Sequence, residues 1–328
     1  MYDVMTLGSA TVDAFATTRS QLIKIYDKTG VHDLLAFPAG SKLLIDKLVY
    51  RIGGGGTNTA TTFRRLGLRT AYIGKVGDGH NGRRVIDYLG KEGVDTRFVR
   101  RCTNSTGFSI ILDEERERDR AILANKGAND DFTTKDIRLK DIDTKWIYSS
   151  SLTGKAHDAL VKICRYARRQ GISVAFNPSS YMCEKGDTYL SPILKNITVL
   201  AFNREEAQLL TGKDTLNDMV RDLHLRGPSI IVITDGKEGA HASDGKNIYS
   251  IKALRVKVTD TTGAGDAFAS TFVAALARQR SMHDCLRMAM INATNVVRYF
   301  GAKEGLLKRQ DIEKELKRRS MKVTEEAI

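Results

Sequence analysis

Residues 260–268 read Asp-Thr-Thr-Gly-Ala-Gly-Asp-Ala-Phe, a loop of small side chains that leads directly into a helical pattern. Apolar residues recur every four positions from Phe268 to Leu276, and this spacing marks one face of an amphipathic helix. Gly263 and Gly265 allow the backbone to approach a ligand closely, and the N–H groups of a first helical turn have no partners inside the helix. A helix that starts in this way binds anions, phosphates above all.

One carboxylate, Asp266, stands where the loop meets the helix. A carboxylate repels phosphate, so its position favours a base that takes a proton from a hydroxyl group attacking a phosphoryl group. The same residues also fit a tight turn followed by an acid that the helix dipole favours. The loop alone leaves both interpretations open, and the rest of the chain has to decide between them.

The composition is that of an ordinary soluble globular protein. The chain has 328 residues, of which 41% are hydrophobic and 28% charged, so it can form one large α/β domain or two smaller ones. Residues 2–7 resemble a strand rather than a signal peptide, and no apolar run reaches membrane-spanning length. The four cysteines are scattered, without a zinc-binding pattern. We therefore expect a cytoplasmic protein with reduced thiols and no membrane partner.

The net charge of +13 is the one unusual bulk property. Lys and Arg are in excess between Lys308 and Lys322, but acids alternate with them at helical pair spacing, as on a solvated helix face. Basic residues are not interleaved with aromatic ones, and the chain has a single Trp. We expect no nucleic-acid partner, and the sequence does not explain the charge.

The second half of the chain alternates strand and helix patterns. Continuous apolar runs predict strands buried on both faces, at residues 172–176, 197–202 and 229–234. Helical patterns cover residues 155–170, 204–226, 264–279 and 283–299. We predict an α/β fold with a doubly wound, mostly parallel sheet and helices on both faces, in which ligands bind at the carboxyl ends of the strands.

Two segments, 14–52 and 106–126, interrupt this plan with alternating, half-exposed strand patterns. We expect them to form a small β-sheet that acts as a lid, although two edge hairpins would also explain them. The α/β nucleotide- and substrate-binding domain then consists of residues 1–13, 53–105 and 127–328.

Further glycine-rich segments precede helices at residues 53–67 and 74–82, and Asn58 stands in the first turn after four glycines. Each segment alone could be structural. Together and in this order, six segments resemble the ribokinase-like (PfkB) carbohydrate kinase family: Gly8–Asp13, Gly53–Gly67, Gly74–Gly82, Asn203–Glu206, Thr234–Ala240 and Asp260–Phe268.

The resemblance implies an ATP-dependent phosphotransferase that moves the γ-phosphate to a hydroxyl group of a small sugar. It makes Asp266 the base on the acceptor hydroxyl. It makes the amides of Gly263, Ala264 and Gly265 the anion hole for the transferred phosphoryl group, in keeping with the electrostatics of this reaction.

On the nucleotide side, Asn203 and Glu206 match an N-x-x-E motif that organises Mg²⁺ and the nucleotide phosphates, with Glu206 reaching the metal through water. A helix cap with a capping-box Glu explains the same pair. Asp260 and Thr262 match positions that hold K⁺ in some relatives, or Asp260 only orders its loop. The full set of expected nucleotide-binding residues is Asn177, Asn203, Glu206, Thr234, Gly236, Gly239 and Asn292.

On the acceptor side, the resemblance points to Thr11, Asp13, Gly54, Gly55 and Asn58. Asp13 can accept hydrogen bonds from two sugar hydroxyl groups. The chain departs from ribokinases at Thr11, where they carry Asn, and at Gly55, where many sugar kinases carry Lys. It also lacks their acidic residue at the strand end.

These departures put ribose in doubt and imply a roomier, less polar pocket. A nucleoside kinase of the same family is the main alternative, with Phe15, Phe37 and Phe108 of the lid as the wall for the base. An inactive nucleotide-binding module is a further alternative. The sequence does not distinguish ATP from ADP or GTP as the donor, and exposed lid edges suggest a homodimer through the lid.

Overall fold

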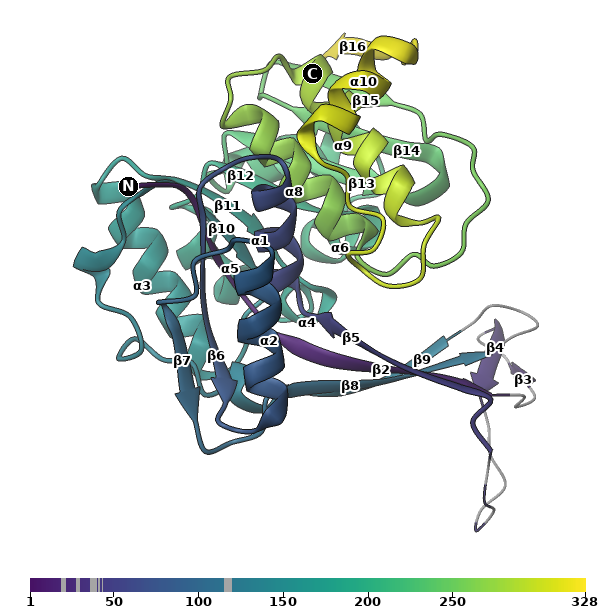
Figure 1. Ribbon diagram of the computed structural model, residues 1–328. Helices are drawn as coiled ribbons and strands as arrows, with labels where there is room; N and C mark the ends of the chain where they lie inside the picture. Colours follow the sequence, from purple (N-terminus) through teal and green to yellow (C-terminus); the bar gives the residue numbers. More distant parts are fainter. Residues whose placement is uncertain (19–21, 28–29, 36–39, 41, 43, 115–119) are drawn as a thin grey trace.

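The computed structural model describes residues 1–18, 22–27, 30–35, 40, 42, 44–114 and 120–328 (Figure 1). A long sheet covered by helices on both faces forms the body, and a smaller sheet projects from it. The strands of the large sheet, in spatial order, are β16 (Val323–Ala327), β15 (Asn247–Ile251), β14 (Gly239–Ser243), β13 (Ile230–Asp235), β12 (Val199–Asn203), β11 (Ser173–Asn177), β10 (Thr144–Ser150), β1 (Tyr2–Leu7), β6 (Thr70–Gly77) and β7 (Val99–Cys102).

The strands from β13 to β7 pair in parallel, as the continuous apolar runs predict. The expected strands at 172–176, 197–202 and 229–234 are β11, β12 and β13, each displaced by one or two residues. Successive residues of β11 alternate between two cores: Val174 and Phe176 pack on one face, and Ala175 packs on the other. The predicted doubly wound α/β fold is confirmed.

Helices bury both faces of this sheet. One core is closed by α3 (Lys155–Arg169), α5 (Gly186–Leu194), α6 (Arg204–Thr211) and α7 (Leu216–Leu225). The other is closed by α1 (Gly55–Arg65), α8 (Ala264–Leu276), α9 (Met282–Val296) and α10 (Arg309–Arg318). The short α4 (Ser180–Cys183) follows β11, and α2 (His80–Lys91) follows β6.

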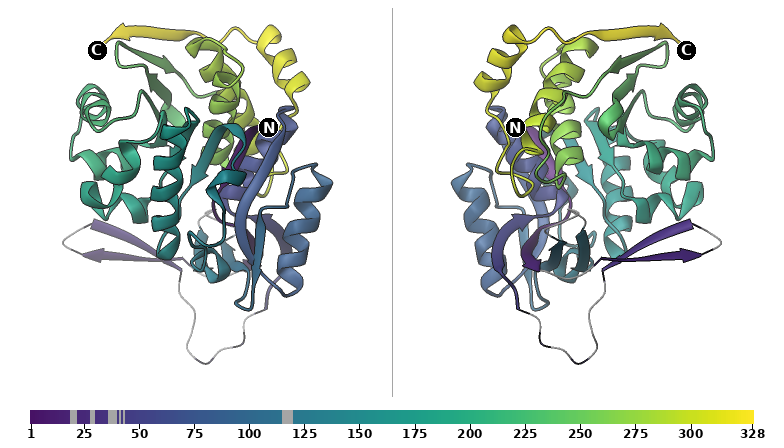
Figure 2. Two further views of the ribbon diagram at one scale, coloured as in Figure 1. Left: turned by 90° about the vertical axis from the view of Figure 1, so that its left-hand side faces the viewer. Right: turned by 90° about the vertical axis from the view of Figure 1, so that its right-hand side faces the viewer.

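The single helix expected at 204–226 is two helices. Gly212 ends α6 in the left-handed conformation, with φ 64°, and Thr215 caps the start of α7. The chain also forms an antiparallel edge that the sequence analysis did not anticipate, in which β14, β15 and β16 extend the parallel sheet. β16 lies at the end of the body opposite the projecting sheet (Figure 2).

The projecting sheet is formed by the two segments that we expect to act as a lid, and we call it the lid sheet. Its strands, in order, are β5 (Lys47–Gly53), β2 (Thr11–Thr18), β8 (Gly107–Glu114) and β9 (Arg120–Asn125), and a separate pair is formed by β3 (Leu22–Asp27) and β4 (Gly30–Leu35). The boundary expected between residues 13 and 14 falls inside β2, because Thr11 already pairs with Gly53 and Gly107. Asp13 is therefore a residue of the lid sheet. No helix of the described chain has the length and apolarity needed to cross a membrane.

Candidate active site

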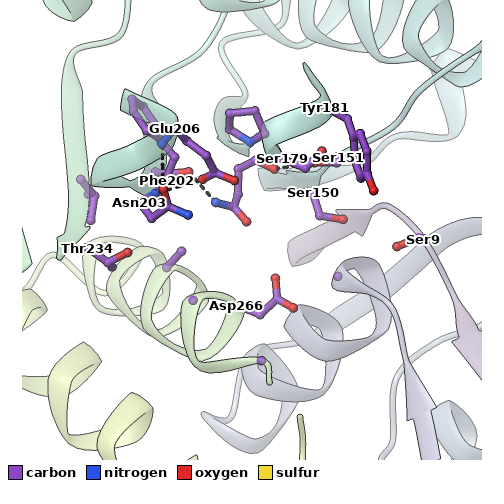
Figure 3. Close-up of a pocket in the computed structure, with 18 of the residues that line it drawn as sticks. Ser9, Ser150, Ser151, Ser179, Tyr181, Phe202, Asn203, Glu206, Thr234 and Asp266 are labelled. Carbon is purple, nitrogen blue, oxygen red and sulfur yellow. Dashed lines mark hydrogen bonds between the residues drawn. The ribbon is translucent and has the colours of Figure 1, made fainter. Parts of the chain in front are cut away.

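A cavity of about 390 Å³ opens at the carboxyl ends of the central parallel strands. Ser150, Asn177 and Asn203, the last residues of β10, β11 and β12, all line it. The starts of α1 and α8 form the opposite wall. Thr234 lies at one end of the cavity and Ser9 at the other, with Asp266 between them (Figure 3). This is the position that doubly wound sheets use for ligands.

A second cavity, of about 550 Å³, adjoins the first, and Thr234 and Gly265 line both. Its walls are mostly apolar and include Leu254, Val256 and Met290. Gly236 and Gly239, in the turn after β13, also line it. A polar cavity joined to an apolar one suits a ligand with a charged part and a flat apolar part.

Asp266 stands in the first turn of α8, which begins at a glycine in the left-handed conformation. Gly263 is the N-cap with φ 77°, and a Cβ atom there would lie 2.5 Å from the Cβ atom of Ala302. Nδ2 of Asn58, in the first turn of α1, donates to Oδ2 of Asp266 at 2.8 Å. Desolvation by the surrounding protein raises the pKa of Asp266, and the Asn58 hydrogen bond and the charge of Lys303 partly oppose this rise.

Around the start of α1 lie buried polar atoms without hydrogen-bond partners in the described structure. They are Oδ1 of Asp13, Oδ1 of Asn58 and Oγ of Ser150. Burial raises the pKa of Asp13, against hydrogen bonds from Thr11 and Ser109. Buried polar atoms are normally satisfied, so three together indicate a place where a ligand supplies the missing hydrogen bonds.

The glycines expected at the acceptor side have steric roles. At Gly53, a Cβ atom would lie 1.8 Å from Oδ2 of Asp13, so β5 can pass this carboxylate only as glycine. Gly54 caps α1 with φ 91°, and a Cβ atom there would lie 2.5 Å from the carbonyl oxygen of Ser9. Gly55 lines the cavity directly, whereas Thr11 and Asp13 lie on the lid strand β2 and are not among the residues that line the cavity.

On the opposite side, Asn203 and Glu206 form a capping box at the start of α6. Oδ1 of Asn203 accepts from the Glu206 N–H at 2.8 Å, and Oε2 of Glu206 accepts from the Asn203 N–H at 3.1 Å. Both residues also line the cavity, so the capping box is compatible with the expected ligand-binding role. Burial raises the pKa of Glu206. Among the described residues, no three His, Cys, Asp or Glu side chains gather as a metal site.

The carboxylate of Asp260 holds its own loop. Its Oδ1 accepts from the backbone N–H and the hydroxyl group of Thr262, at 2.8 and 2.7 Å. Its Oδ2 accepts from the N–H of Gly301 at 2.9 Å. These hydrogen bonds order the loop, which was the alternative to K⁺ binding for Asp260. They also connect the loop before α8 to the chain after α9.

Asn292 lies outside both cavities, contrary to the expectation that it approaches the nucleotide base. It is fully buried: its Nδ2 donates to Oγ1 of Thr271, and its Oδ1 accepts from the N–H of Leu307. The neighbouring Ala293 and Thr294 line the apolar cavity instead. Helical rotation of about 100° per residue turns position 292 towards α8.

Neither Phe15 nor Phe108, the two described members of the expected aromatic wall, lines either cavity. Phe15 is buried, and its ring packs on Phe300 with 4.7 Å between the centroids. Phe108 packs into a cluster with Val12 and Ile52. Phe37 lies outside the described residues.

Two lysines at the site were missed by the sequence analysis. Lys303 is buried behind the start of α1, where its Nζ donates to the carbonyl oxygen of Ile52 at 2.6 Å and to Oγ1 of Thr57 at 3.0 Å. Burial lowers the pKa of Lys303 to about 8. Lys126 lines the cavity itself. A lysine inside the small-residue run 301–305 is a weak sequence signal for burial, and nothing marks Lys126 before the lid is folded.

The chain is similar to known carbohydrate kinases in sequence and in fold. Residues 4–309 match the model of the pfkB family carbohydrate kinases. A sugar kinase of Archaeoglobus fulgidus, itself uncharacterised, is 33% identical over 247 residues, which cover 74% of this chain and 96% of the relative.

Two solved structures share the fold. Arabidopsis thaliana ribokinase complexed with ribose and ATP has a TM-score of 0.78 at 20% identity and covers 96% of this chain and 99% of its own. A Methanocaldococcus jannaschii nucleoside kinase has a TM-score of 0.81 at 19% identity, with 97% and 99% covered. The extent of the family match, together with a 33% identical relative, shows that this chain belongs to the pfkB family of carbohydrate kinases.

Proposed function

We propose that this kinase transfers the γ-phosphate of ATP to a hydroxyl group of a small sugar, with Asp266 as the base. The observation that carries the proposal is the set of unpartnered buried atoms of Asp13, Asn58 and Ser150 around the start of α1, where Asn58 donates to Asp266. A polyhydroxylated acceptor supplies the hydrogen bonds that these atoms lack, and it brings a hydroxyl group to the base.

In this mechanism, Asp266 takes the proton of the acceptor hydroxyl while its oxygen attacks the phosphoryl group. Asn58 orients the carboxylate through its 2.8 Å hydrogen bond. The amides of Gly263, Ala264 and Gly265 face the negative charge that develops on the phosphoryl oxygens. Because the Ala264 N–H also closes a turn onto the Thr261 carbonyl at 3.2 Å, we expect the two glycines to make the shorter contacts.

Mg²⁺ and K⁺ fit the residues to different degrees. Glu206 is the carboxylate at the phosphate end of the cavity, and a lone carboxylate suits Mg²⁺ that keeps its waters and takes phosphate oxygens as ligands. When bound, Mg²⁺ neutralises phosphate charge. The oxygens of Asp260 already accept three hydrogen bonds, so K⁺ would have to share them.

A sugar is favoured over a nucleoside because Phe15, one of the lid aromatics expected to pack on a base, is buried. Phe15 is stacked against Phe300, and the half-buried Phe108 packs on the cluster that contains Val12, so the Phe15 ring is not free to pack on a base. A coupled phosphorylation screen of sugars and nucleosides, with ATP, ADP and GTP and with and without K⁺, tests the proposal. Turnover of nucleosides alone would overturn the choice of acceptor. Absence of any turnover would overturn the enzymatic function.

Lys303 should keep the two carboxylates of the site ionised. The charged groups around its ammonium group are Asp13, Glu304, Asp266 and Glu92, and the charge of Lys303 lowers the pKa of both Asp13 and Asp266. With a pKa of about 8, Lys303 is protonated at neutral pH. We expect Lys303→Met to move the acid limb of the kcat/KM profile to higher pH by about 1 unit, because both carboxylates then lose a stabilising charge.

Lys303→Arg retains the charge and serves as the control, whose acid limb should stay near that of the wild type. A folded Met variant with an unmoved acid limb would show that Lys303 only supports the packing of Ile52 and Thr57.

We also propose that a second copy of the chain covers the outer face of the lid. Tyr50, Ile110 and Leu123 form an exposed row across β5, β8 and β9, in register with one another through Ala14. Ile110→Glu should convert a dimer to a monomer in sedimentation experiments. A wild-type protein that sediments as a monomer at tens of micromolar would contradict this proposal.

A further inference from the structure

Lys126 is the cation of the catalytic cavity. The charged side chains that line this cavity in the described structure are Lys126, Glu206 and Asp266. Its ammonium group lies 5.4 Å from the centroid of the Tyr181 ring, and it has no carboxylate partner among the described residues. Tyr181 itself is 63% exposed, which is unusual for an aromatic residue at the rim of a cavity. The pair therefore offers a positive charge and an aromatic ring to the solvent-filled space.

The ring locates this charge at the acceptor end. Figure 3 shows Tyr181 beside Ser151, Ser150 and Ser9, at the end of the cavity away from Thr234. Thr234 marks the junction with the apolar second cavity, which suits the flat base of the nucleotide. Lys126 thus lies on the far side of Asp266 from the donor base.

The backbone of Lys126 is held in place at the base of the lid. Asn129, which is buried, donates from Nδ2 to the carbonyl oxygens of Lys126 and Ala10, at 2.9 and 3.0 Å. Its Oδ1 accepts from the N–H of Ala10 at 2.8 Å. The N–H of Ala128 donates to the carbonyl oxygen of Ser105 at 2.7 Å. These bonds attach the segment after β9 to the residue that follows Ser9, so the lysine is presented from a fixed position.

An ammonium group that lines the cavity without a carboxylate partner among the described residues is poorly explained by a neutral acceptor. Asp13 and Asp266 already serve hydroxyl groups at the other side of the acceptor end, whereas the serines there are uncharged. An anion on the acceptor would form a charge-assisted hydrogen bond with Lys126 and could accept another from the Tyr181 hydroxyl. The positive charge of Lys126 would also offset the repulsion between the carboxylates of the site and an anionic substrate.

We propose that the sugar acceptor carries an anionic group, a carboxylate or a phosphate ester, which binds Lys126 and Tyr181 at the end of the molecule opposite the hydroxyl group that is phosphorylated. This inference rests on the proposed function and specifies its substrate class. Lys126 is then the residue that separates anionic from neutral acceptors.

The test compares matched neutral sugars, sugar acids and sugar monophosphates as acceptors of the wild type, Lys126→Met and Lys126→Arg. We expect the wild type to prefer an anionic acceptor. Lys126→Met should lower kcat/KM for this acceptor by about 10- to 100-fold, mainly by raising KM. Values for neutral acceptors and the KM for ATP should change less than about twofold. The preferred compound, acid or monophosphate, identifies the anion, and Lys126→Arg should retain most of the preference.

Lys162→Met is the matched control, because it removes the same charge from an exposed position of α3. Equal losses for neutral and anionic acceptors, or a raised KM for ATP, would overturn the inference while leaving the kinase function intact. Calorimetric binding of the same compounds to Asp266→Asn gives a readout without turnover. Lack of any Lys126-dependent preference for anions there would also overturn the inference, whereas failure of every acceptor to turn over bears on the proposed function.

Discussion

Asp266→Asn is expected to lower kcat by about 10²- to 10⁴-fold, the usual contribution of a general base. The amide cannot take the proton of the acceptor hydroxyl. It can still accept the hydrogen bond from Asn58 that holds the side chain in place. The nucleotide should bind with nearly unchanged affinity, because we expect its base to bind in the apolar second cavity. A coupled assay measures kcat, and calorimetry measures the dissociation constant for ATP.

The pH dependence of the wild type should follow the same carboxyl group. Desolvation raises the pKa of Asp266, so the rate should begin to fall at a higher pH than for an ordinary aspartate as the base becomes protonated. The stability of the fold changes with pH in the opposite direction to the rate. The contribution of a carboxyl with a raised pKa is present below its ordinary pKa and is lost as the pH rises through the raised value. The Asn variant should therefore melt at the same or a higher temperature at pH 7.

Asp158→Asn is the matched control, because Asp158 is also an acid in a first helical turn, that of α3, but is exposed. Its kcat should equal that of the wild type. An Asp266→Asn enzyme with nearly full turnover would show that another group is the base.

Gly263→Ala should reduce both turnover and stability. An alanine at position 263 would have to adopt φ near 77°, and this strain lowers the free energy of unfolding by about 1–3 kcal/mol. Its Cβ atom would also lie 2.5 Å from the Cβ atom of Ala302. Relief of this contact has to move the start of α8 or the segment at Ala302. Either movement displaces the anion hole, and we expect kcat to fall by about 10²- to 10³-fold.

Gly212→Ala separates strain from displacement. Gly212 also has a left-handed φ, of 64°, but no atom lies within 4 Å of an added Cβ. Gly212→Ala should lower the free energy of unfolding, measured by urea denaturation, by about 1 kcal/mol and should leave kcat unchanged. A Gly263→Ala enzyme with normal turnover would mean that the position of the α8 start is not critical for phosphoryl transfer.

Local patterns anticipated the elements near the middle of the chain well. Strands β11, β12 and β13 and helices α3, α8 and α9 lie within a few residues of their expected positions, since buried strands and amphipathic helices repeat over short distances. The break at Gly212 and the edge strands β14 to β16 were missed. The edge depends on β16 pairing with β15 across more than seventy residues, which no local pattern reports.

Some of the expected site residues line the cavity, and others do not. Gly55, Gly263, Gly265 and Asp266 all line the cavity, because glycine-rich helix starts are visible in the sequence. Asn292 was misplaced by one helical position, because the direction in which a buried helix residue points depends on its neighbours.

The family, the doubly wound sheet and the loop from Asp260 to Phe268 at the centre of the site could all be read from the sequence. The surroundings of Asp266 became visible only in the folded chain. Asn58 lies 208 residues away in the chain, and Lys303 reaches Thr57 across 246 residues. Lys126 reaches the cavity through the fold of the lid. Catalytic loops follow local backbone rules, whereas the charges that set the pKa of a base and select its acceptor come from distant segments brought together by packing.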